Sequence, residues 1–142
     1  MPYAGWLLYL LLACLGARPQ HGMATVFGES SWDGGTNPND RLACDHRRID
    51  DAKDVIVASN EYPCHTLLRI HNPRTGKVVT ARVADRGPKH ARLDLSKLTA
   101  QALRHNGMER VIFYPVGRDT RTPRQRRKGE SDASKRVHRG IV

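Results

Sequence analysis

Val83-Ala84-Asp85-Arg86-Gly87-Pro88, followed by Leu93-Asp94-Leu95-Ser96, is the stretch that decides the interpretation of this chain. The residues just before Asp85 alternate with the period of a half-buried strand, and Gly87-Pro88 ends that strand in a turn. Asp85 is therefore expected where a rigid strand meets a loop, a usual position for a general acid, a general base or a group that holds a sugar. The alternative is that Asp85 only stabilises the turn, since Asp-Arg-Gly is common turn chemistry.

Short apolar segments elsewhere predict the remaining strands. They cover residues 24–27, 55–58, 67–71, 78–84 and 111–116, and the sequence Asn-Pro-Arg-Thr-Gly at 72–76 predicts a hairpin turn. One helix is predicted over 97–105, with Ser96 as its N-cap and Asn106-Gly107 as its end. Strands in this number with one helix favour a small closed β-barrel.

Taken in order from about Met23 to Val116, the motifs of the chain resemble those of the rare lipoprotein A family. Asp-Arg-Gly-Pro with a downstream Asp-Leu-Ser is the most specific part of the resemblance. The resemblance implies a mainly β fold over residues 22–117: a small six-stranded double-psi β-barrel with one or two short helices, related to expansin and barwin-like barrels. The motifs are Met23-Ala24-Thr25-Val26-Phe27-Gly28, Leu42-Ala43-Cys44, Val57-Ala58-Ser59-Asn60, Tyr62-Pro63-Cys64-His65-Thr66, Arg69-Ile70-His71-Asn72-Pro73-Arg74-Thr75-Gly76, Asp85-Arg86-Gly87-Pro88 and Leu93-Asp94-Leu95-Ser96.

The resemblance also implies a function in the cell envelope. Catalytic members of this family are lytic transglycosylases, which cleave the glycan strands of peptidoglycan to anhydro-ended products without using water. This chemistry needs a positioned acid/base, and Asp85 matches the acidic residue of the family. The predicted site comprises Asp85, Asp40 and His46 as catalytic residues and Asp94, Asn60 and Arg86 as substrate-binding residues. An alternative role for Asp94 is to cap the helix that begins beside it.

The chain departs from the catalytic pattern at two positions. Catalytic relatives carry a Glu in the first loop, where His46 or Asp40 falls here, and a His in the second loop, where Asn60 or Ser59 falls. An Asn can hold a sugar hydroxyl but cannot move a proton near neutral pH. The alternative function is therefore a non-catalytic peptidoglycan-binding or expansin-like wall-loosening module, and a third is a structural or partner-binding envelope protein.

The cysteines predict a disulfide between Cys44 and Cys64, because an even pair within the domain is typical of exported proteins. Some relatives also have cysteines at similar places. The alternative is a zinc site built from these cysteines with His46 and His65, all of which are ligand types. The chain has no Cys-x-x-Cys motif, and adjacent side chains at 64 and 65 on an extended segment would point to opposite faces. We therefore predict neither a metal nor a cofactor.

Residues 6–15 form an apolar run that is too short for a stable membrane anchor and typical of an export signal over residues 1–20. The segment before it carries no Lys or Arg, which a signal peptide normally has. Cys14 follows Leu11-Leu12-Ala13, which resembles a lipobox, so lipidation at Cys14 is one outcome of this prediction. A buried N-terminal segment is the alternative. The predicted location is the periplasm, the cell envelope or the exterior, with or without a membrane tether.

Residues 118–142 hold six of the ten net positive charges of the chain, from nine Lys or Arg against three acidic residues. This composition predicts a disordered basic tail. Such a tail could bind an anionic polymer or a lipid surface, or be solvated without a partner. It contains no aromatic residue on which bases could stack, which argues against nucleic acid as the partner. The predicted partner of the domain is peptidoglycan glycan, bound by a monomer.

Overall fold

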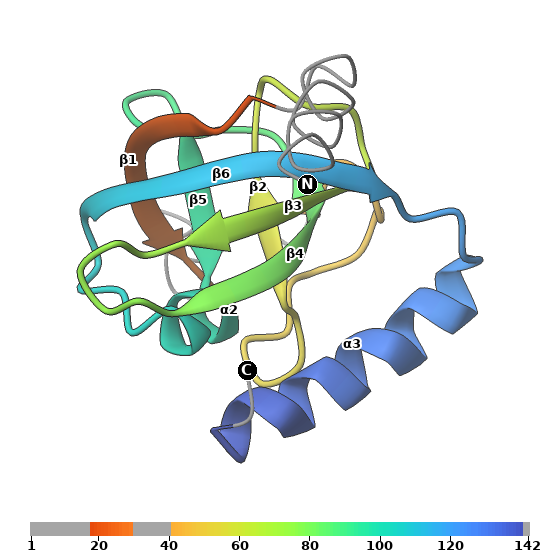
Figure 1. The fold of residues 1–142 in the computed structure, drawn as a ribbon. Helices are drawn as coiled ribbons and strands as arrows, with labels where there is room; N and C mark the ends of the chain where they lie inside the picture. Colours follow the sequence, from red (N-terminus) through yellow and green to blue (C-terminus); the bar gives the residue numbers. More distant parts are fainter. Residues whose placement is uncertain (1–17, 30–40, 141–142) are drawn as a thin grey trace, which may run out of the picture.

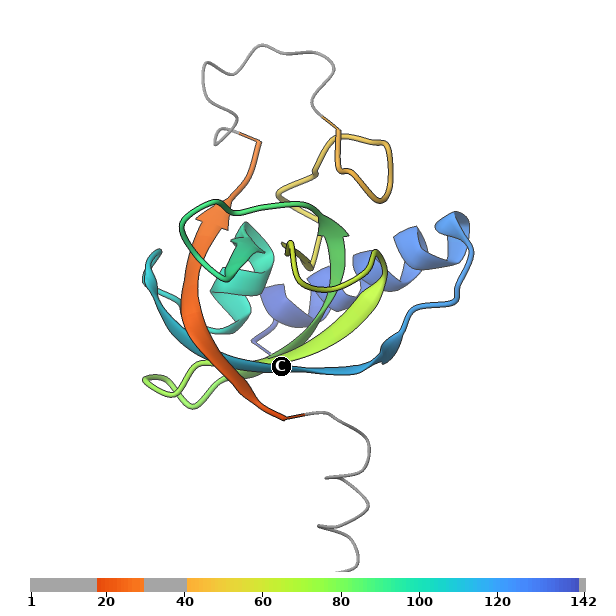
Figure 2. The same ribbon diagram turned by 90° about the horizontal axis from the view of Figure 1, so that it is seen from above.

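Six strands close into a barrel in the computed structural model, which describes residues 18–29 and 41–140 (Figure 1). The strands follow one another around the barrel in the order β1-β5-β2-β4-β3-β6, and Figure 2 shows them curving into a ring. Pairs β1·β5 and β2·β4 are parallel, and the other four pairs are antiparallel. The strands are β1 (Gln20–Phe27), β2 (Ile56–Ala58), β3 (Thr66–His71), β4 (Val78–Asp85), β5 (Leu93–Ser96) and β6 (Glu109–Arg118).

This mixed, closed barrel confirms the predicted fold class, a small six-stranded double-psi β-barrel. Five of the strands lie where the apolar segments predict them, and β5 was not predicted as a strand. The turn at 72–76 is also confirmed, since the N–H of Gly76 donates to the Asn72 carbonyl at 2.8 Å. Gly76 has a φ of 71°, which glycine adopts without strain. The apolar run 6–15, Cys14 and Asp40 lie outside the described residues.

Helix α2 (Lys97–Ala102) begins where the sequence predicts and ends earlier than expected. Ser96 is its N-cap, because the Ser96 hydroxyl accepts a hydrogen bond from the Thr99 N–H at 3.4 Å. Leu98 and Leu103 are buried at this end of the barrel and belong to the same core cluster as Phe113 of β6. Full burial of each such side chain stabilises the fold by about 1.5–3 kcal/mol.

A second apolar cluster fixes the loop between β1 and β2 on the barrel. Leu42 and Ile49 of that loop pack with Ile56 and Ala58 of β2 and with Ala84 of β4. The described part of this loop therefore has a defined position beside the end of β4.

The structure corrects the predicted disordered tail, because residues 123–138 form helix α3 (Pro123–His138). Thr122 begins the helix with a capping box: its hydroxyl accepts from the Gln125 N–H at 3.3 Å, and the Gln125 side chain accepts from the Thr122 N–H at 2.8 Å. Pro123 occupies the first turn, where a missing N–H costs nothing. The sequence therefore contains local signals for the start of a helix, in the capping box of Thr122 and Gln125 and in Pro123.

One face of α3 is buried against the barrel side, at positions Glu130, Ser134 and Val137. The Ser134 hydroxyl donates to the Ala52 carbonyl at 2.7 Å, and Val137 joins the main core cluster. A tail this poor in apolar residues is expected to be disordered because hydrophobic burial cannot offset its conformational entropy. Ion pairs at Glu130 add to these contacts and help to hold the helix in place.

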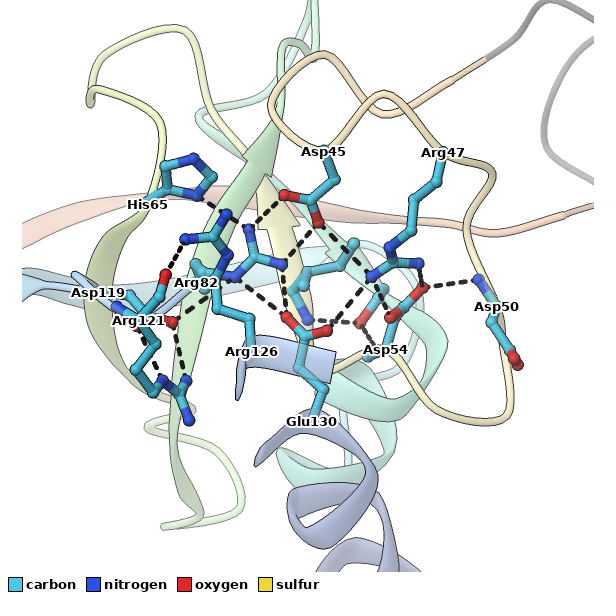
Figure 3. A network of polar contacts seen from close by, with 12 residues as sticks. Asp45, Arg47, Asp50, Asp54, His65, Arg82, Asp119, Arg121, Arg126 and Glu130 are labelled. Atoms are coloured by element: carbon cyan, nitrogen blue, oxygen red, sulfur yellow. Dashed lines mark hydrogen bonds and ion pairs between the residues drawn. The ribbon is translucent and has the colours of Figure 1, made fainter. Parts of the chain in front are cut away.

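A buried ion network joins α3 to the barrel and to the loop before β2 (Figure 3). At its centre lies Arg82 of β4, with a side chain that is 3% exposed. The Arg82 guanidinium donates to the Asp45 carboxylate at 2.9 and 2.7 Å and to Glu130 at 3.0 Å. Arg47 donates to Glu130 at 3.2 Å and to Asp54 at 2.8 and 2.7 Å. Each of these three carboxylates therefore faces at least one arginine.

Burial and arginine charge set the pKa values of this network. Burial alone would raise the pKa of Asp45, but the hydrogen bonds and charge of Arg82 outweigh burial and lower that pKa. Burial dominates at Glu130 and raises its pKa in spite of Arg82. The charged form of Glu130 therefore depends on its arginine partners, which oppose the effect of burial.

Among the described residues, no helix is both long and apolar enough to span a lipid bilayer.

Candidate active site

Two carboxylates lie in one row across four neighbouring strands. In the strand pairing, Thr25 of β1 lies opposite Asp94 of β5, Asp94 opposite Ala58 of β2, and Ala58 opposite Asp85 of β4. Partners in such a row project toward the same side of a sheet. The α-carbons of Asp94 and Asp85 are two strand spacings apart, about 9.5 Å. The structure thus brings together the two acidic residues that the sequence singled out.

A β-bulge places Asp85 at the end of this row. The pairing of β2 with β4 shifts by one residue, so that Val57 faces Val83 while Ala58 faces Asp85. Val83 and Ala84 are both fully buried, which breaks the alternation of the strand and re-aims the following side chain. One carboxylate oxygen of Asp85 accepts from the Ala43 N–H at 2.9 Å. Asp85 is therefore held by the loop before β2 as well as by its own strand.

Asp94 lies in surroundings that raise its pKa. Burial raises the pKa of Asp94, the hydrogen bond that the Thr25 hydroxyl donates to it at 2.9 Å opposes this, and the negative charge of Asp85 raises it further. The net effect is a pKa above the ordinary value. Asp94 does not cap α2, because Ser96 does. Both Asp94 and Asp85 remain partly exposed, so a ligand can reach them.

Asn60 and Arg86 lie near Asp85 but are engaged in holding loops together. The Asn60 amide donates to the Pro88 carbonyl at 3.1 Å and accepts from the Gly87 N–H at 2.8 Å. The Arg86 guanidinium donates to the carbonyls of Ser59 at 2.8 Å and Tyr62 at 2.6 Å, and to the Cys64 sulfur at 3.2 Å. These contacts fix the turn after β4. The predicted sugar-binding role of both residues stays a prediction.

His46 is not brought together with Asp85 by any hydrogen bond within the described ranges. It is exposed, has a φ of 55°, and lines a cavity of about 130 Å³ beside α3, together with Arg126 and Arg127. Its predicted role as partner of Asp85 stays a prediction. Asp40, the other candidate for that role, lies outside the described residues.

Cys44 and Cys64 form the predicted disulfide, with α-carbons 5.5 Å apart. Their sulfurs are bonded to each other, so they are not the thiolate ligands that the zinc alternative requires. The bond joins the loop that carries Ala43 to the loop before β3. It therefore supports the backbone on both sides of Asp85.

We expect replacement of both cysteines by serine (Cys44→Ser with Cys64→Ser) to lower the free energy of unfolding by about 3 kcal/mol, because the bond closes a loop of 20 residues. Urea unfolding of the variant and of the oxidised and reduced native protein measures this. The reduced native protein should unfold at the same urea concentration as the variant. A variant within about 0.5 kcal/mol of the oxidised protein would contradict the expectation.

Thr25 is the member of the row that the sequence did not identify as functional. Its hydroxyl donates a hydrogen bond that lowers the pKa of Asp94, although the two residues are 69 positions apart in the chain. No local pattern identifies it, because the parallel pairing of β1 with β5 is a long-range feature of the barrel. The only available signal was that Thr25 interrupts the apolar run of its own segment.

No protein-family model matches the sequence, and neither does any curated protein. Several solved structures are similar in fold. The Streptomyces papain inhibitor has 18% sequence identity and a TM-score of 0.49, with 69% of this chain and 93% of that chain covered. The apo expansin of Clavibacter michiganensis has 26% identity and a TM-score of 0.49, with 74% and 53% covered. Cerato-platanin 3 from M. perniciosa has 14% identity and a TM-score of 0.47, with 68% and 94% covered.

The chain thus spans about half the length of the expansin. The resemblance to rare lipoprotein A stays a prediction from the motifs of the sequence. The assignment of a function rests on the chain's own residues.

Proposed function

We propose that this protein is an exported lytic transglycosylase that cleaves the glycan strands of peptidoglycan at the Asp94–Asp85 row. The observation that carries the proposal is the pairing of two partly exposed carboxyl groups in which one, Asp94, has a pKa raised by burial and by the other. Two titratable groups with different environments are the usual arrangement for acid/base work. The motif resemblance, with Asp85 at the family's acidic position, supports the same reaction class.

In this proposal Asp94, which the sequence predicted as a substrate-binding residue, takes the acid/base role in place of Asp85. The protonated carboxyl group of Asp94 donates its proton to the oxygen that links two amino sugars. The bond between that oxygen and the anomeric carbon breaks, and the Asp85 carboxylate stabilises the oxocarbenium-like transition state. A hydroxyl of the same sugar then bonds to the anomeric carbon and closes the anhydro ring. The proton of that hydroxyl returns to Asp94, so no water is consumed and the enzyme ends in its starting state.

A second function, glycan binding or wall loosening without cleavage, is favoured by one specific observation. His46 lines the cavity beside α3, while the side chains of Asn60 and Arg86 hold backbone groups. A site in which these groups are engaged elsewhere would still bind glycan and would lack part of the proton relay. Product analysis separates the two functions.

The disulfide supports export, because such bonds persist in oxidising compartments. The proposed location is the periplasm, the cell envelope or the exterior. The apolar run at residues 6–15 would direct the export, and lipidation of Cys14 would tether the protein to a membrane.

The test is digestion of purified glycan strands freed of stem peptides, with products identified by mass spectrometry, using the native protein and the Asp85→Asn variant. We expect anhydro-ended products from the native protein and background levels from the variant, which keeps the shape of the side chain and removes its charge. Arg69→Gln, an exposed change on β3, is the control and should cleave normally. Retention on insoluble peptidoglycan with no products from any of these proteins would establish the binding function instead.

A further inference from the structure

Helix α3 presents a second charged surface, away from the row of carboxylates. Figure 1 shows α3 lying alongside the barrel, with one side turned outward. The side that faces the barrel carries the buried residues Glu130, Ser134 and Val137. With 3.6 residues per turn, positions 124, 128, 135 and 139 lie on the opposite side, within about 60° of one another around the helix axis. Each of these positions holds a cation.

We call these four exposed residues, Arg124, Lys128, Lys135 and Arg139, the basic row. The row extends over 15 residue steps, about 22 Å along the axis. Arg127 and Arg136, also exposed, flank it. Asp132 beside the row pairs only loosely with Lys135, at 3.8 Å between two side chains that are 67% and 59% exposed. The charge of the row is therefore largely uncompensated within the described residues.

The rest of the network explains why these cations remain available. Two of the acidic groups near α3 are paired with arginines outside the row: Glu130 with Arg82 and Arg47, and Asp119 with Arg121. The helix is fixed on the barrel by its inward face. The basic row is consequently a rigid, linear array of charge, in contrast to the mobile tail that the composition indicated.

We propose that the basic row binds a linear polyanion that carries phosphate groups along its length. Arginine binds phosphate through paired N–H groups, and lysine supplies point charges at the flexible ends of its stem. A straight row on a convex helix matches a strand-like polymer, which can lie along it, better than it matches a plane of lipid head groups. The side of α3 that holds Val137 faces the barrel, so the helix presents no apolar face with which to enter a bilayer.

Two sources share this chemistry, a phosphate polymer of the envelope and a nucleic acid. The exposed side of α3 holds no aromatic residue on which a base could stack. We therefore favour a phosphate polymer without bases. This surface is separate from the Asp94–Asp85 row, so the inference does not depend on the proposed cleavage activity.

The experiment measures binding of the full chain to inorganic polyphosphate by fluorescence anisotropy. We expect the affinity to fall by about fifty-fold between 50 and 200 mM salt, because neutralising four phosphates releases the counterions bound to them. A variant with all four residues of the basic row changed to Gln should lose this binding and still cleave or bind glycan like the native protein. The matched control changes four exposed arginines outside α3 to Gln: Arg48, Arg69, Arg104 and Arg110.

Circular dichroism first establishes that both variants keep native helix content, as expected because every changed residue is exposed. Single-stranded DNA and vesicles of phosphatidylglycerol serve as further probes. Binding of polyphosphate at least as tight as that of DNA of equal charge supports a phosphate polymer of the envelope as the ligand. Tighter binding of DNA assigns the basic row to nucleic acid and overturns the envelope polymer as the ligand. Equal losses in the two variants, or binding to vesicles without binding to polyphosphate, would overturn the proposal.

Discussion

Replacing Arg82 with methionine is expected to lower the free energy of unfolding by about 3–5 kcal/mol, because it leaves buried carboxylates without their main partner. Asp45 and Glu130 would then share only Arg47, which already binds Asp54. A typical domain has only about 5–15 kcal/mol in total. Urea unfolding at neutral pH measures the loss, and hydrogen exchange of residues 123–138 shows whether α3 leaves the barrel first.

Arg69→Met is the matched control, because Arg69 lies on the neighbouring strand and its side chain is exposed. It should change stability by less than about 0.5 kcal/mol. A triple variant, Arg82→Met with Asp45→Asn and Glu130→Gln, removes the unpaired charges and should recover most of the loss. If Arg82→Met proved as mild as Arg69→Met, the network would not be what holds α3.

Replacing Asp94 with asparagine is expected to reduce the rate of glycan cleavage by at least 100-fold, the usual contribution of a general acid. Binding to glycan should persist, since asparagine keeps the size and the hydrogen-bonding capacity of the side chain. Initial rates of anhydro-product formation, set beside retention on insoluble peptidoglycan, measure the two effects. A variant that cleaves at the native rate would remove Asp94 from the mechanism.

The pH dependence of cleavage tests the role of Asp94 more directly through Thr25. Asp94 must be protonated to act, so the rate should fall as pH rises through its pKa, which lies above the ordinary value. The Thr25 hydroxyl lowers that pKa by binding the charged form. Thr25→Val should therefore move the alkaline limb of the profile to higher pH while leaving a working enzyme. If the alkaline limb of the variant lies at the same pH as that of the native protein, a group other than Asp94 determines its position.

The local parts of this fold could be predicted from the sequence because they depend on local signals. Alternation identified β4, and a capping residue with a following stop identified α2, although its end came earlier because Arg104 turns into a left-handed conformation with a φ of 48°. β5 was missed because its four residues are too few to show alternation. The motif at Asp94 nevertheless singled out a residue that lies in the same row as Asp85, and its role in a site stays a prediction.

The relations between distant segments could not be predicted in the same way. The bulge that sets Asp85 and the pairing of Thr25 with Asp94 depend on which strands become neighbours in the closed barrel. Composition was misleading for α3, because a basic segment normally lacks the apolar surface to fold. The acid that anchors it, Glu130, finds its arginine 48 residues away, and nothing near it in the sequence indicates that pair.

The docking of α3 on Arg82 makes the stability of the barrel wall depend on a segment that lies outside the barrel. All six strands are complete by Arg118, so a fragment ending there could close the barrel. It would nevertheless leave Arg82 without its partner Glu130, and the core cluster without Val137. Full stability therefore requires that α3 docks on the barrel. Fragments that lack α3 would keep an unpaired Arg82 in β4 and would be more exposed to proteases and chaperones.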